Sequence, residues 1–137
     1  EIMLDNYRKT VHIEAQTMID MARKQILPAV ESYAAKLAET LATKKALSPL
    51  LGGKYETSLL TKLSGLTDDI AEAADALEAS LAAYHKIGDV TEAAYFIRDE
   101  VLPKMDALRA PADEAERFTA AEYWPFPTYG DLLFGVK

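Results

Sequence analysis

The 137-residue sequence lacks cysteine, and it also lacks an uninterrupted apolar run of the roughly 18 residues that cross a membrane. The absence of cysteine excludes a disulfide scaffold, a thiolate zinc site and a cysteine nucleophile. No basic stretch followed by an apolar one opens the sequence, so we expect no signal peptide, no membrane span and a cytoplasmic location. A net charge of −7 argues against a nucleic-acid surface.

What the sequence has in abundance is alanine and leucine, which favour helices, and half of its residues are apolar. Apolar residues recur every three, four or seven positions from Tyr7 to Leu41, which predicts a helix over about residues 4–46. Pro28 lacks an amide hydrogen and crowds the carbonyl of Lys24, so we expect a kink there.

Two further helices are predicted. Leucines and other apolar residues alternate at spacings of four and three from Leu59 to Tyr84, which predicts a helix over about 54–87. Asp89 and Glu92 have the spacing of a capping box and predict the start of a third helix, over about 89–109. This third helix contains Pro103, and a short helix or turn is expected over about 112–121.

We therefore predict a single all-α domain over 1–137, with three long antiparallel helices in an up-down-up bundle. In that arrangement the first and third helices run parallel, and matched kinks at Pro28 and Pro103 bend both around one core. Pro111 is expected to break the third helix.

The last stretch, 122–137, differs from the rest because it is aromatic and rich in proline. Six of the twelve aromatic residues lie within the seventeen positions that begin at Phe118. The alternating prolines hold this backbone extended, and its apolar side chains must dock, either on the bundle itself or on another domain or subunit. The docking candidates are Tyr123, Trp124, Phe126, Tyr129, Leu133 and Phe134.

No catalytic, cofactor-binding or metal-binding constellation is evident. Gly53-Lys54 fails two requirements of a phosphate-binding loop, since Ser48 and Tyr55 stand at positions that the motif assigns to other residues. Neither His12 nor His85 follows a glutamate by three positions, as a di-iron bundle site requires. We expect His12 to be a lone surface or interface histidine and His85 to stabilise the end of its helix.

Two stretches go beyond a generic helical pattern. They are residues 5–29, which include DNYRKTVHIEA, MIDMA and QILPA, and residues 123–134, YWPFPTYGDLLF. Together they resemble the C-terminal helical domain of type III glutamine synthetase, the long-chain bacterial form.

The resemblance implies a longer parent enzyme that joins ammonia to glutamate with ATP, through γ-glutamyl phosphate and with Mg or Mn at the site. It implies catalytic domains outside this chain, an assembly of stacked hexameric rings, and no catalytic, cofactor or metal residue here. The partners expected are the missing domains and further copies of the parent, not nucleic acid or membrane. The alternative is an independent helical module that binds a partner protein. An autonomous enzyme is a third possibility, but no arrangement of catalytic residues in the sequence supports it.

Overall fold

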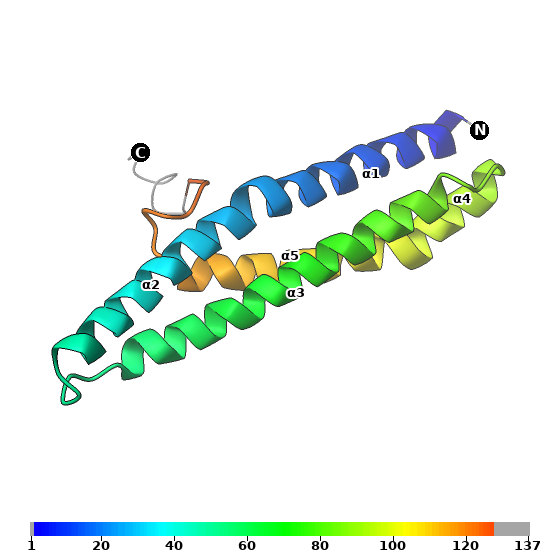
Figure 1. Ribbon diagram of the computed structural model, residues 1–137. Helices are drawn as coiled ribbons and strands as arrows, with labels where there is room; N and C mark the ends of the chain where they lie inside the picture. Colours follow the sequence, from blue (N-terminus) through cyan, green and yellow to red (C-terminus); the bar gives the residue numbers. More distant parts are fainter. Residues whose placement is uncertain (1, 128–137) are drawn as a thin grey trace.

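The structure is a computed structural model that describes residues 2–127, apart from the side chains of Ile2 and Leu4. Over these residues the chain is helical and has no strand, and it forms three long rods (Figure 1). The prediction of an all-helical fold with three long helical elements is confirmed. The first rod comprises α1 (Ile2–Met21), the π-helix η1 (Ala22–Ile26) and α2 (Leu27–Leu47). The second rod is α3 (Lys54–Tyr84), and the third comprises α4 (Val90–Phe96), the π-helix η2 (Ile97–Val101) and α5 (Leu102–Phe118).

The rods lie alongside one another, and α3 contacts both of the others. Figure 1 shows the chain running along the first rod, returning along α3 and running back through α4 and α5. The turn between α2 and α3 therefore lies at one end of the molecule, and the turn between α3 and α4 lies at the other end, near the start of α1.

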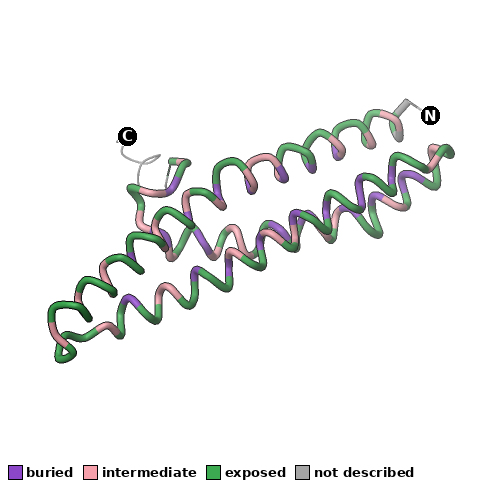
Figure 2. The backbone as a smooth tube through the Cα atoms, in the orientation of Figure 1, coloured by how far each residue is buried: buried purple, intermediate pink, exposed green. Residues whose placement is uncertain are grey.

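The core is a line of aliphatic side chains between the rods, visible as the buried positions along each helix in Figure 2. Its largest fully buried members are Ile19, Leu63, Ile70, Leu77, Ile97, Leu108, Val30 and Val101. Alanines with no exposed surface, such as Ala15 and Ala74, lie between them and let the helices approach closely. Tyr7, the first residue of the apolar pattern that predicts the first helix, is 40% exposed and does not belong to this core.

Each π-helix ends two residues before a proline. The Leu27 N–H donates to the Ala22 carbonyl and the Leu102 N–H donates to the Ile97 carbonyl, five residues back in both cases. Pro28 and Pro103 follow, and their rings would collide with the carbonyl four residues earlier in a regular α-helix. A wider turn is one way to relieve that collision. The matched kinks themselves stay a prediction.

Two helix ends differ from those expected. The second helix ends at Tyr84, because the Lys86 and Ile87 N–H groups donate to carbonyls three residues back and tighten the last turn. The break expected at Pro111 is absent, and α5 continues through this proline to Phe118. Ala115, beyond Pro111, is fully buried, and this continued packing of the apolar face offsets the hydrogen bond that proline cannot make.

The turn after α3 is closed by the start of α4. Asp89 precedes α4 in extended conformation, and its carboxylate accepts a hydrogen bond of 2.9 Å from the Glu92 N–H. This bond is one half of the capping box expected from the sequence.

Candidate functional site

The aromatic segment that follows α5 is the part of the chain where the sequence analysis placed its docking candidates. The helix ends where Thr119 turns to extended backbone while its N–H still donates to the Ala115 carbonyl at 2.9 Å. A short turn follows, in which the Tyr123 and Trp124 N–H groups donate to the Ala120 and Ala121 carbonyls. Figure 1 shows this segment folding back beside the first rod.

Trp124 anchors the segment to the bundle. Its side chain is only 6% exposed and belongs to the same buried cluster as the helix core. Phe126 packs against that cluster from outside, and its ring meets the Trp124 ring edge-on, with centroids 6.1 Å apart. Such an edge-to-face pair adds stabilisation beyond the apolar area that each ring buries.

Tyr123 makes a second contact of the segment, with α2. Its ring lies 5.1 Å from the ring of Tyr33, centroid to centroid. Burial raises the pKa of Tyr33, and the neighbouring phenol of Tyr55 raises it further. The end of α5, the middle of α2 and the start of α3 therefore share one aromatic neighbourhood. Tyr129, Leu133 and Phe134 lie outside the described residues.

Next to this neighbourhood lies an open groove of about 640 Å³. It is lined by Lys54, Tyr55, Ser58, Leu59, Lys62 and Phe118. The Lys62 ammonium lies 4.9 Å from the centre of the Phe118 ring and 3.4 Å from the Glu114 carboxylate. The Lys62 ammonium and the Phe118 ring of this groove therefore already interact with groups of the same bundle.

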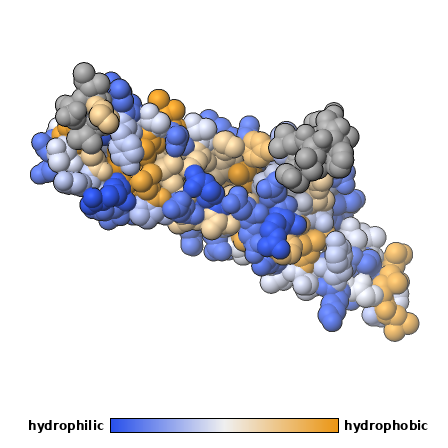
Figure 3. All heavy atoms as spheres, turned by 180° about the vertical axis from the view of Figure 1, so that it is seen from behind, coloured by the Kyte–Doolittle hydropathy of each residue, from blue (hydrophilic) through white to orange (hydrophobic). Residues whose placement is uncertain are grey.

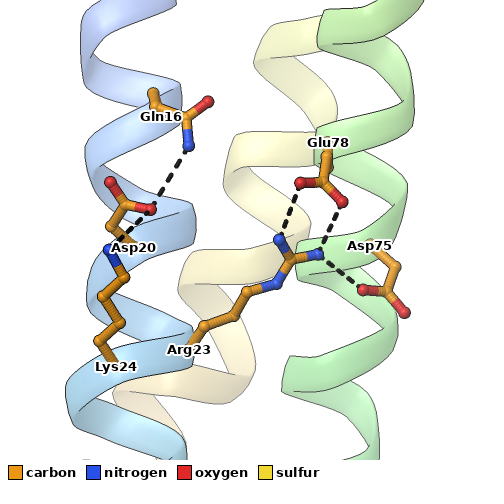
Figure 4. Close-up of polar contacts among 6 residues, drawn as sticks. All are labelled: Gln16, Asp20, Arg23, Lys24, Asp75 and Glu78. Atoms are coloured by element: carbon orange, nitrogen blue, oxygen red, sulfur yellow. Dashed lines mark hydrogen bonds and ion pairs between the residues drawn. The ribbon is translucent and has the colours of Figure 1, made fainter.

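A second feature, which the sequence analysis did not find, joins the first rod to α3. Arg23 donates to Asp75 at 2.8 Å and to both oxygens of Glu78 at 2.9 and 3.0 Å (Figure 4). The Arg23 guanidinium lowers the pKa of Glu78, and the two carboxylates together raise the pKa of Arg23. Spacing along one helix carries no signal for a partner more than 50 residues away, so the sequence does not reveal these pairs.

The two histidines, treated separately in the sequence, lie together in the structure. The His12 and His85 rings meet edge-on with centroids 4.8 Å apart, and His12 also lies near the ring of Tyr84. Residues 2–127 contain no group of three or more His, Asp or Glu side chains placed to hold a metal ion. Nor does any helix within them have the length and apolarity to cross a bilayer.

These features define a class of protein: an elongated, three-rod helical domain whose polar and aromatic groups serve to hold the rods and the returning segment together. Comparison with known proteins shows which family this chain is similar to. Residues 1–45 match the family described as glutamine synthetase C-terminal domain. The resemblance expected from the sequence is thereby confirmed, and the relatives described next extend it beyond this first rod.

Three curated relatives align with nearly the whole chain. A glutamine synthetase from Butyrivibrio fibrisolvens is 36% identical over 140 residues, which is 100% of this chain and 20% of the relative. A type-3 glutamine synthetase from Dictyostelium discoideum is 24% identical over 98% of this chain and 19% of the relative. A glutamine synthetase from Bacteroides fragilis (strain YCH46) is 30% identical over 98% of this chain and 19% of the relative. The chain spans about a fifth of the length of the curated relatives it matches.

Proposed function

We propose that this chain is the non-catalytic C-terminal helical domain of a type III glutamine synthetase. The parent enzyme would join ammonia to glutamate with ATP, through γ-glutamyl phosphate, in domains outside these 137 residues. The observation that carries the proposal is the alignment of 98 to 100% of this chain with about a fifth of three glutamine synthetases.

In this proposal the domain has a structural role, in subunit assembly or in support of the catalytic body. An up-down-up bundle bent at Pro28 and Pro103 gives a long, stiff body, and the Arg23 ion pairs and the buried Trp124 hold its parts together. The parent forms stacked hexameric rings in the cytoplasm, as the resemblance implies.

ATP and the divalent metal, Mg or Mn, belong to the catalytic domains of the parent in this account. No step of the ligase reaction is assigned to a side chain of this chain, because the described residues offer no cluster of metal ligands. The contribution of the domain to activity is therefore indirect, through the position and assembly of the catalytic body.

The proposal is tested on the full-length parent and on a form that lacks residues 123–134. The parent is expected to form glutamine from glutamate, ammonia and ATP, and the deletion is expected to change its particle mass in sedimentation. A parent without ligase activity would refute the family assignment of function. An active parent whose mass is unaffected by the deletion would limit the aromatic segment to stabilising its own bundle.

A further inference from the structure

The turn between α2 and α3 carries a concentration of exposed apolar side chains. Leu47, Leu50, Leu51 and Tyr55 are 75%, 93%, 41% and 68% exposed. They are half of the large hydrophobic side chains found exposed in the described chain, and they lie within nine consecutive positions. Figure 3 shows hydrophobic side chains gathered at the extreme end of the molecule. We call residues 45–55 the tip; exposed apolar groups of this kind mark interaction surfaces.

The tip is a built structure that holds its leucines outward. The Leu50 N–H donates to the Ser48 hydroxyl at 3.1 Å, and the Leu51 N–H donates to the Ser48 carbonyl at 3.2 Å. Below the tip, Lys44 and the buried carboxylate of Glu56 form an ion pair of 2.5 Å that joins the end of α2 to the start of α3. A partner would therefore meet a preformed surface and lose little conformational entropy of the tip on binding.

The tip is also basic in an acidic protein. Residues 45–55 contain two lysines, Lys45 and Lys54, and no acidic residue, which gives a net charge of +2 in a chain whose net charge is −7. The Lys45 ammonium also donates to the Leu51 carbonyl at 3.2 Å. A partner that suits this surface is acidic at its rim and apolar at its centre.

The flank of the same bundle offers such a surface. An open groove of about 570 Å³ lies between α3 and α5. Its apolar lining consists of Leu66, Ala73, Ala107, Ala110 and Pro111, and its acidic lining consists of Asp69, Glu72 and Glu114. Glu114 already pairs with Lys62 and Arg117 of the same bundle, so Asp69 and Glu72 form the acidic rim offered to a partner. The apolar lining residues from α5 are small, which leaves room for leucine side chains. We call this surface the flank groove.

We propose that the tip of one copy of this chain docks into the flank groove of a second copy, with the leucines on the apolar floor and the lysines facing the acidic rim. The tip cannot reach its own groove, because Tyr55 and Leu66 lie on the same straight helix, roughly 17 Å apart along its axis. The contact is head-to-side, so it joins successive copies into a ring or a chain. This proposal rests on the assembly role proposed above, and it names the surface that performs it.

The test measures the particle mass of the full-length parent by mass photometry at a series of concentrations. Two charge-reversal variants remove the complementarity from opposite sides: Lys45→Glu with Lys54→Glu on the tip, and Asp69→Lys with Glu72→Lys in the flank groove. Each is expected to raise the concentration at which the assembly half-dissociates by at least tenfold. The combined four-fold variant, which swaps the charges on both surfaces, is expected to recover most of that loss.

A matched pair tests the apolar part of the contact. Leu50→Ser is expected to weaken assembly, whereas Ile13→Ser, which changes a residue 63% exposed on α1, is expected to leave it unchanged. Circular dichroism verifies that each variant keeps its helices. Single-side variants that assemble like the wild type, or a combined variant that recovers nothing, would overturn the interface. Ligase activity of the wild-type parent is measured separately, so its absence would count against the proposed function and not against the mass comparison.

Discussion

Replacing Trp124 by alanine removes the anchor of the segment that returns after α5. Trp124 is only 6% exposed, and its side chain contacts both the helix core and the ring of Phe126. A buried aromatic ring of this size covers roughly 150–250 Å², which at about 25 cal/mol per Å² corresponds to an upper limit of about 4–6 kcal/mol. Because this full area is an upper limit, we expect a loss of about 3 kcal/mol.

The assay is urea unfolding followed by circular dichroism. Trp124 is the only tryptophan in the chain, so its fluorescence in the wild type reports on docking of the segment alone. We expect the fluorescence and helix transitions of the wild type to coincide, Trp124→Phe to keep most of the stability, and the exposed control Ile13→Ala to change it by less than about 0.5 kcal/mol. A Trp124→Ala protein within about 0.5 kcal/mol of the wild type would refute the claim that this ring is part of the core.

Two further substitutions test local features. Asp89→Ala removes the acceptor for the Glu92 N–H and is expected to lower the free energy of unfolding by about 1 kcal/mol in urea titrations, whereas an unchanged value would mean that the cap adds nothing. Arg23 lowers the pKa of Glu78 below 4.5. The stabilisation that the Arg23–Glu78 ion pair gives the folded state is therefore present above pH 4.5 and is lost as the pH falls through the lowered pKa. Arg23→Gln should therefore lose less stability on acidification than the wild type, and identical pH profiles would contradict the pairing.

Much of the fold follows from patterns within single helices. The apolar spacing predicts three rods, and the two prolines that follow Leu27 and Leu102 indicate where regular α-helix is interrupted, since each ring conflicts with a carbonyl one turn earlier. The same rule fails at Pro111. There, burial of Ala115 beyond the proline keeps α5 helical, and that burial depends on packing between rods.

The parts that sequence analysis missed all join distant positions. Arg23 meets Glu78 across 55 residues, and His12 meets His85 across two rods. A helical period indicates which face of a helix is polar, but it carries no information about which residue of another helix lies opposite. The flank groove is a further case, because its acidic and apolar residues come from α3 and α5 together.

We propose that these 137 residues form a structural domain of a ligase whose chemistry takes place elsewhere in a longer chain. The most direct test is to measure ATP-dependent glutamine formation by the full-length parent and by this chain alone, at equal molar concentrations. The account predicts turnover by the parent and none above background by the chain. Glutamine formation by the purified chain itself would contradict it.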